Sequence, residues 1–341
     1  MSTTVLEAPA SRFAAVPVTA GLGATLILAM LVALTVGPAD TSLGDVLAAL
    51  TGRGDARLTT VVVDIRLPRV LLGAIVGAAL ALSGAALQGL LRNPLADPGV
   101  IGVSSSAALG AVVALYFGLA GAFALALPVA AITTALAGTA VLYVLASRDA
   151  SVLTLILAGV AVSSLATALT SLAMNLSPNP FSLSDIVLWL LGSLSNRSFT
   201  DIALAGPFIA VGAVLLATTG RGLDALTLGG EAATTLGVNL ARLRWVVIAG
   251  SALAVGASVA VTGVIGFVGL VVPHLVRPLV GHAPSRILLP SALGGATLLV
   301  LADLVIRTAP GSQELKLGVV TALIGAPFFL YLVIATRRAM R

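Results

Sequence analysis

The side chains that could do chemistry are few in this chain, and their spacing matches no catalytic or metal-binding pattern. It contains no Cys, one lysine (Lys316) and two histidines, His274 and His282. The histidines lack metal-ligand spacing and a carboxylate or thiolate partner, so we interpret them as structural. Lys316 follows a leucine, whereas a phosphate-binding P-loop requires Gly-Lys-Ser/Thr. We therefore expect no catalytic residue, no metal and no cofactor in this chain.

Long uncharged tracts separate the few charged residues. No charged side chain occurs between Asp97 and Arg148, and similar tracts recur along the sequence. A bilayer core requires about 20 consecutive apolar residues per helix, and a charge at its centre costs about 2.5 to 3.5 kcal/mol. These tracts predict membrane spans.

The composition supports an all-α polytopic membrane protein. The chain has 341 residues, of which 59% are hydrophobic and 9% charged, whereas a soluble domain has roughly 25% charged residues. The net charge is +5, but the basic residues are scattered among short connections and form no patch, which argues against a nucleic-acid partner. We expect one transmembrane domain over residues 1–341 with ten helices, near residues 17–37, 69–91, 101–118, 122–146, 151–174, 201–219, 243–263, 266–282, 286–306 and 316–336.

The arginines and the single lysine predict the orientation. Ten spans place both termini on one side of the membrane. That side would hold eleven arginines: Arg12, Arg92, Arg148, Arg221, Arg242, Arg244, Arg277, Arg286, Arg337, Arg338 and Arg341. The other side would hold seven basic residues: Arg53, Arg57, Arg66, Arg69, Arg197, Arg307 and Lys316. The positive-inside rule makes the first side cytoplasmic, including an N-terminal tail at residues 1–16.

Three connections between the spans are long enough to form structure of their own. The first outer connection contains an amphipathic stretch from Ser42 to Leu50. The second contains an apolar run from Ile186 to Leu194, which is too short to span and predicts an interfacial or re-entrant helix. The third, at residues 221–244, is cytoplasmic and predicts two short helices broken at Gly237.

Asp303 is the only carboxylate in the interior of a predicted span. Arg307 follows it by one helical turn, near the outer end. Ion-coupled carriers place ionisable groups in the middle of the membrane. A local ion pair with Arg307 is therefore the favoured interpretation of Asp303, and a proton relay is the alternative.

Several motifs occur together in one order. They are RLPR from Arg66, SGAALQGLLRNPLADPGVIGVSSSAALG from Ser83, LAGVAVSS from Leu157, WLLGSL from Trp189, LGGEAATTLGVN from Leu228, GVIGFVGLVVPHLVR from Gly263, LLPSALGGATLLVLADLVIR from Leu288 and VVTALIGAPFFLYLV from Val319. With these motifs the chain resembles the FecCD-type permeases of type II ABC importers. Those permeases carry ferric siderophores, haem or vitamin B12 across the inner (cytoplasmic) membrane.

The resemblance implies partners and a division of labour. It implies a ten-helix permease fold, a second permease copy or a paralogue, a cytoplasmic ABC ATPase dimer that holds ATP and Mg, and an external substrate-binding protein. This chain would then be no enzyme itself. A ferric siderophore is the expected cargo, with haem or vitamin B12 as alternatives. The rival from another class is an ion-coupled secondary transporter, for which Asp303 would be the coupling group.

The resemblance also assigns roles to particular residues. The ATPase-coupling segment would comprise Leu228, Gly229, Gly230, Glu231, Ala232, Leu236 and Gly237. Gly230 stands where the family often has a second acidic residue, so Glu231 alone would supply the polar contact. Arg66, Arg69 and Arg307 would face the binding protein, with headgroup anchoring as the structural alternative. Val152 and Ile156 would contribute to the cytoplasmic gate, and the fifth and tenth spans would line the path.

Overall fold

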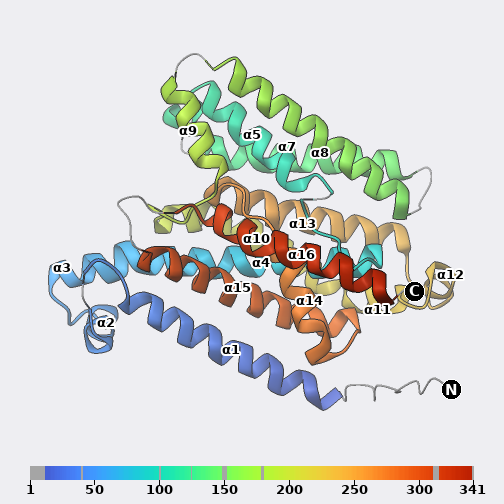
Figure 1. The fold of residues 1–341 in the computed structure, drawn as a ribbon, viewed down its shortest axis with the longest axis horizontal. Coiled ribbons are helices and arrows are strands. Elements are labelled where there is room, and N and C mark those ends of the chain that lie inside the picture. Colours follow the sequence, from blue (N-terminus) through green and yellow to red (C-terminus); the bar gives the residue numbers. More distant parts are fainter. Residues whose placement is uncertain are drawn as a thin grey trace.

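The computed structural model describes residues 12–39, 41–99, 101–123, 125–147, 152–177, 180–309 and 315–339, and these residues fold into helices without a strand. The long helices run roughly parallel to one axis of the molecule (Figure 1). They are α1 (Arg12–Thr35), α4 (Leu67–Leu91), α5 (Val103–Tyr116), α7 (Ala126–Ser147), α8 (Val152–Asn175), α10 (Phe199–Thr218), α13 (Leu240–Thr262), α14 (Val268–Val280), α15 (Pro284–Thr308) and α16 (Leu317–Ala339).

Each of the ten predicted spans corresponds to one of these helices. Six described segments are long and apolar enough to cross a membrane by length and composition. Helices α5 and α14 are each four residues shorter than predicted: α5 has 14 residues and α14 has 13. Both begin after a residue in the left-handed region, Gly102 and Phe267, so the preceding residues lie outside the helix.

The first helix begins earlier than the sequence predicted. Helix α1 starts at Arg12, before the predicted start of the first span at residue 17, and it accommodates Pro17 within the helix. The cytoplasmic location of the tail at residues 1–16 stays a prediction. Residues 1–11 lie outside the described part of the chain, as do Arg148 and Arg341.

Short helices cluster at the two ends of the bundle. They are α2 (Leu43–Leu50), α3 (Ala56–Thr59), the π-helix η1 (Thr60–Arg66), α6 (Leu119–Ala122), α9 (Pro180–Leu190), α11 (Gly220–Leu226) and α12 (Gly230–Thr235). The predicted amphipathic stretch is α2, which begins at a capping box formed by Ser42 and Asp45. The apolar run predicted from Ile186 to Leu194 contributes to α9, although this helix begins earlier, at Pro180, and ends at Leu190.

Helix α4 lies at the centre of the core. It packs against α15, α13, α14 and α10, and most of its residues are buried. Two close crossings depend on glycine. A methyl group at Gly77 would overlap the carbonyl of Gly295 on α15, and one at Gly84 would overlap the carbonyl of Gly269 on α14. Small residues at such crossings let the backbones of membrane helices approach closely.

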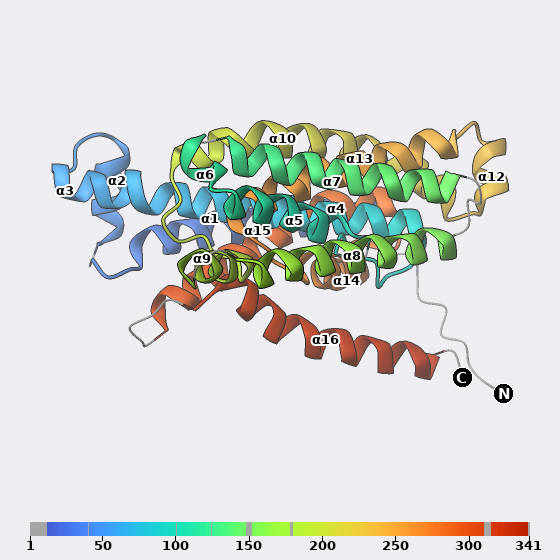
Figure 2. The ribbon, with the colours of Figure 1, turned by 90° about the horizontal axis from the view of Figure 1, so that it is seen from above.

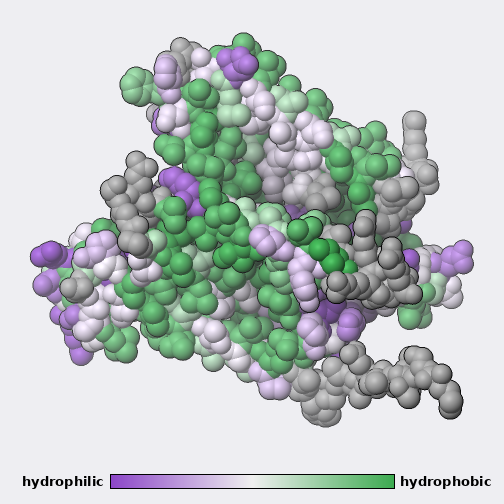
Figure 3. Space-filling model, viewed as in Figure 1, coloured by the Kyte–Doolittle hydropathy of each residue, from purple (hydrophilic) through white to green (hydrophobic). Residues whose placement is uncertain are grey.

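The surface has an apolar middle and polar ends. Hydrophobic residues cover the middle of the bundle, and hydrophilic residues gather over α2 and α3 at one end and near α12 at the other (Figure 3). We call these the α2 end and the α12 end. The first turn of α1 and the last turn of α16 both lie toward the α12 end (Figure 1). The molecular axis between these ends is therefore the axis across the membrane.

Two helices on one side of the molecule are poorly covered. Figure 2 shows α16 set apart from the bundle, on the same side as α8 and α9. Helix α8 exposes Leu157 and Leu165, and α16 exposes Leu323 and Tyr331. This side therefore presents a large apolar face that the chain itself leaves uncovered.

Candidate functional site

The connection between α10 and α13 forms a two-helix corner at the α12 end. Figure 2 shows α12 protruding beyond the ends of the long helices. The prediction of two short helices is confirmed, but the break predicted at Gly237 is wrong. The break lies at Thr227–Gly229, where Gly229 has a φ of 107°, a conformation that glycine adopts at low cost. Gly237, with a φ of 84°, instead ends α12 before α13 begins.

The first helix of the corner is fixed to the bundle. Leu223 and Leu226 of α11 are buried, and Leu223 packs beside Gly89 near the end of α4. The Asp224 Oδ1 accepts a hydrogen bond of 2.8 Å from the Ser285 backbone N–H in the first turn of α15. A carboxylate stabilises such a helix N-terminus because the first N–H groups have no partner within the helix. Sequence reasoning missed Asp224, since its partner lies 61 residues away.

Exposed apolar side chains flank the second helix of the corner. Leu228 is 68% exposed and Leu236 is 63% exposed, and they flank the exposed Glu231. The seven residues predicted for coupling are therefore brought together on one protrusion: Leu228, Gly229, Gly230, Glu231, Ala232, Leu236 and Gly237. Apolar side chains exposed around a charged group on a polar end of the molecule are typical of a protein-docking surface.

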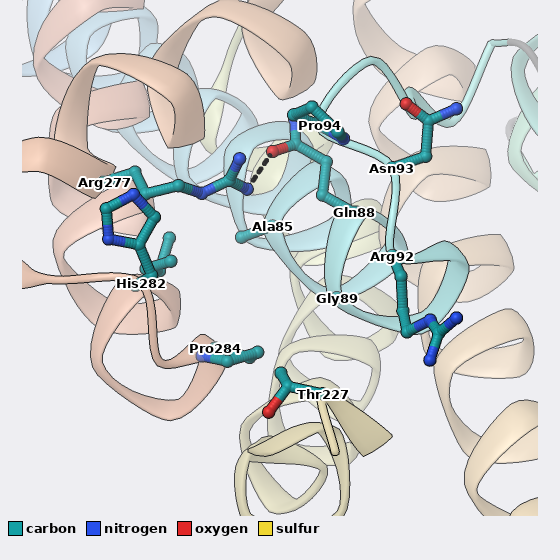
Figure 4. Close-up of a pocket in the computed structure, with 11 residues that line it drawn as sticks. Ala85, Gln88, Gly89, Arg92, Asn93, Pro94, Thr227, Arg277, His282 and Pro284 are labelled. Atoms are coloured by element: carbon teal, nitrogen blue, oxygen red, sulfur yellow. Dashed lines mark hydrogen bonds between the residues drawn. The ribbon is translucent and has the colours of Figure 1, made fainter. Parts of the chain in front are cut away.

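A cavity of about 480 Å³ lies beside this corner. Its walls come from the last turn of α4 and the following loop, the α11–α12 turn, and the α14–α15 connection (Figure 4). Arg277 on α14 donates a hydrogen bond of 2.8 Å from Nη2 to the Gln88 Oε1. Gln88 in turn donates from Nε2 to the carbonyl oxygens of Gly269 at 3.2 Å and of Ala96 at 3.4 Å. Sequence reasoning assigned no role to this cavity.

The two histidines lie apart from each other. The His274 ring packs edge-on against Phe328 with centroids 5.8 Å apart, whereas His282 lines the cavity. The described residues contain no group of three or more His, Cys, Asp or Glu side chains placed to hold a metal ion.

At the α2 end, Asp303 is the centre of a buried ion cluster. Arg69 donates to it from Nε at 3.0 Å and from Nη2 at 2.8 Å, and the Arg307 Nε lies 3.2 Å from its Oδ2. The predicted local ion pair between Asp303 and Arg307 is confirmed. Arg69, which is 234 residues distant in sequence, is an additional partner that spacing could not reveal.

The guanidinium groups of Arg66 and Arg307 cap the C-terminal end of α1. Arg66 donates to the carbonyl oxygens of Leu34 at 2.8 Å and Thr35 at 3.0 Å, and Arg307 donates to that of Ala33 at 3.0 Å. The last carbonyls of a helix have no partner within it, so these arginines satisfy them. Arg66 is only 4% exposed. All three predicted docking arginines therefore have partners inside the chain, and their docking role stays a prediction.

The predicted gate residues lie in the first turns of α8. Val152 begins this helix, and its side chain lies outside the described part of the chain. Ile156 is partly buried and packs against the main core. The gate role of both residues stays a prediction.

A bundle of apolar helices with polar ends and a protruding corner has the architecture of a membrane transport permease. Residues 25–335 match the model of the FecCD transport family, and the chain belongs to this family. The protein is an ABC importer permease, as the resemblance in the sequence implied.

The sequences of several relatives align with most of this chain. The uncharacterized ABC transporter permease protein YvrB of Bacillus subtilis is 46% identical over 85% of this chain and 83% of its own length. The vitamin B12 import system permease protein BtuC of Vibrio cholerae is 45% identical over 80% of this chain and 82% of its own length. The hemin transport system permease protein HmuU of Yersinia pestis is 42% identical over 80% of this chain and 83% of its own length.

The fold also matches a solved structure. That structure is described as an inward-facing conformation of a putative metal-chelate type ABC transporter. The match has a TM-score of 0.82 and 35% identity, and it covers 94% of this chain and 99% of the other. The predicted permease fold is confirmed.

Proposed function

We propose that this chain forms half of a membrane passage for a metal chelate and is driven by a separate cytoplasmic ATPase. The observation that carries the proposal is the corner of α11 and α12. Its α11 half is held by buried leucines and the Asp224–Ser285 hydrogen bond, while its α12 half exposes Leu228, Glu231 and Leu236. A rigidly anchored protrusion of this kind transmits the movement of a docked partner to the helices behind it.

The energy source follows from the same reasoning. The sequence has no Gly-Lys-Ser/Thr segment, so ATP and Mg would be held by an ATPase dimer docked on the corner. The rival, an ion-coupled carrier, loses support because both oxygens of Asp303 are engaged by Arg69 and Arg307.

The second half of the passage would be another permease, either a copy of this chain or a paralogue. The uncovered apolar face of α8 and α16 supports this arrangement, because both helices expose large apolar side chains on one side of the molecule. Burying this face against a similar chain would place the fifth and tenth spans along a shared axis.

We assign the α12 end to the cytoplasm of the inner membrane and the α2 end to the external binding protein. Both termini would then be cytoplasmic. The eleven-to-seven excess of basic residues predicted for the termini side supports this orientation. Because the chain lacks Cys, single cysteines at Thr234 and Arg53 can be labelled in intact cells with an impermeant maleimide. Only the cysteine at position 53 should react; labelling at 234 alone would invert the assignment.

Among metal chelates, the names of relatives point to vitamin B12 or haem, and the family resemblance makes a ferric siderophore the third candidate. The deciding experiment is ATP-dependent uptake of each labelled compound into proteoliposomes that contain this permease, its ATPase and its binding protein. The proposal predicts uptake of one of the three. Uptake of none, by a complex that hydrolyses ATP, would contradict the proposed cargo class.

The coupling role of the corner has its own test. In the same proteoliposomes, Glu231→Arg should lower transport per ATP hydrolysed by about tenfold, because it inverts the only charge between the two exposed leucines. The matched control, Asp185→Arg, inverts an exposed carboxylate on α9 at the other end. Unchanged transport by the Glu231 variant would remove this residue from coupling.

A further inference from the structure

The cavity beside the corner has an unbalanced positive charge. Its lining includes the cations Arg92 and Arg277, together with the polar side chains of His282, Gln88, Asn93 and Thr227, and it includes no carboxylate. Within the described part of the chain, no Asp or Glu forms an ion pair with Arg92 or Arg277. This contrasts with the α2 end, where Asp303 balances two arginines.

The position of Arg277 is fixed without its charge being neutralised. Gln88 is buried, and its amide nitrogen donates to backbone carbonyls, so its oxygen faces the guanidinium group. An amide oxygen accepts one hydrogen bond but supplies no negative charge. Arg277 therefore retains donors for an anion in the cavity.

Arg92 approaches the cavity from another direction. Figure 4 shows Arg277 and His282 on one side of the last turn of α4 and Arg92 on the other. Arg92 has a φ of 47°, a left-handed conformation that glycine or asparagine adopts more readily at a helix end. A basic residue at a helix C-terminus also interacts favourably with the helix dipole. The helix dipole explains why α4 and α14 each end near an arginine. It does not explain why both arginines line the same cavity.

The remaining walls are apolar and lie at the level of one membrane surface. Ala85, Pro94, Pro284 and Ile287 complete the lining, where α4 and α14 end and α15 begins. Basic pockets between transmembrane helices at this depth are typical sites for anionic lipid headgroups. The volume, about 480 Å³, lies within the range of small-molecule sites.

We propose that this cavity binds the phosphate group of an anionic phospholipid from the adjacent leaflet. The phosphate accepts hydrogen bonds from Arg277, the charge of Arg92 attracts the anion from the other side of the α4 turn, and the glycerol portion contacts the apolar wall. Because Thr227 belongs to the α11–α12 turn and Pro284 begins α15, the bound lipid joins the coupling corner to α4 and α15. The site follows from the charges and walls of the cavity and is independent of the cargo.

The test measures lipid binding by the purified full chain in a neutral detergent. Dioctanoyl phosphatidylglycerol is titrated while the thermal unfolding midpoint is recorded, with dioctanoyl phosphatidylcholine and inorganic phosphate as separate arms. Phosphatidylglycerol should raise the midpoint at saturating concentration, since a ligand that binds only the folded state stabilises it. Phosphatidylcholine should have little effect, and inorganic phosphate should act only at much higher concentration.

Variants connect that response to the cavity. Arg92→Gln removes an exposed cation and should weaken the apparent affinity for phosphatidylglycerol about tenfold. Thr227→Glu places a competing carboxylate at the rim and should weaken it by at least as much. Arg53→Gln removes an exposed cation at the other end and should leave the affinity unchanged.

Three results would overturn the proposal. Equal responses to the two lipids would exclude recognition of an anionic headgroup. Equal potency of inorganic phosphate and phosphatidylglycerol would indicate a site for free phosphate instead. Wild-type affinity in both cavity variants, combined with loss of ATPase binding in those variants, would assign the cavity to an acidic side chain of the ATPase.

Discussion

At the residue scale, buried charged side chains connect the helices at the α2 end. Asp303 joins α15 to Arg69 on α4, and Arg307 extends the same cluster to the last turn of α1. These contacts hold three helices by groups that are almost entirely withdrawn from solvent. Such a cluster differs from exposed surface pairs, which contribute about 0 to 1 kcal/mol.

Asp303→Asn tests whether this cluster is structural. Removing the shared carboxylate leaves two buried cations without compensation, which we expect to cost about 3 to 5 kcal/mol. The thermal midpoint of the purified protein in detergent should fall clearly, whereas Asp185→Asn, at an exposed position, should leave it nearly unchanged. A normal midpoint together with lost affinity for the binding protein would instead support the docking role predicted for Arg69 and Arg307.

Asp97 gives the fold a pH dependence. It lies in the loop between α4 and α5, where burial raises the pKa of its carboxyl to about 6 despite a hydrogen bond from the Gly99 N–H. The folded state therefore binds this proton more tightly than the unfolded state. The contribution of Asp97 to stability declines as the pH rises from about 4 through 6.

Asp97→Asn should remove this dependence, because the amide stays neutral and keeps an oxygen acceptor. The stability of the variant minus that of the wild type should therefore increase as the pH is raised from 4.5 to 7.5. Thermal midpoints at these two pH values measure the change. A stability difference that does not vary with pH would show that the carboxyl titrates normally.

At the element scale, close helix crossings and the corner of α11 and α12 define the architecture. Gly84→Ala tests the crossing of α4 and α14, since its methyl group would overlap the Gly269 carbonyl in the backbone. We expect a strong loss of folded protein, measured as the monodisperse fraction in size-exclusion chromatography. Gly23→Ala on α1, where a methyl group meets nothing within 4 Å, is the matched control. Equal yields of the two variants would contradict the crossing.

The elements themselves were largely predictable because hydropathy is a local property. Ten apolar tracts predicted ten helices, and the amphipathic stretch after Ser42 predicted α2. The break in the corner was misplaced because both Gly229 and Gly237 adopt positive φ, and nothing local indicates which of them separates the two short helices.

Contacts between distant segments were not predictable in the same way. Arg69 and Asp303 lie 234 residues apart, and Gln88 and Arg277 lie 189 apart. Their pairing depends on how α4 packs between α14 and α15, which no spacing rule supplies. For the same reason, the sequence placed Arg66 on the surface, whereas the structure turns it toward the carbonyls of α1.

At the scale of the whole molecule, the chain is a largely uncharged bundle with a polar surface at each end. The α12 end offers a protrusion and a cationic cavity, and α8 and α16 leave an apolar side open. Each of these features is incomplete in one chain. The proposed assembly completes them with an ATPase, membrane lipid and a second permease.

The most direct test of this account is solute accumulation by the purified permease in proteoliposomes, measured with and without the ATPase. With the ATPase, the binding protein and ATP, labelled cargo should accumulate against its gradient. Without the ATPase, neither ATP nor an imposed proton or sodium gradient should cause accumulation. Accumulation by the permease alone under an ion gradient would contradict the central claim.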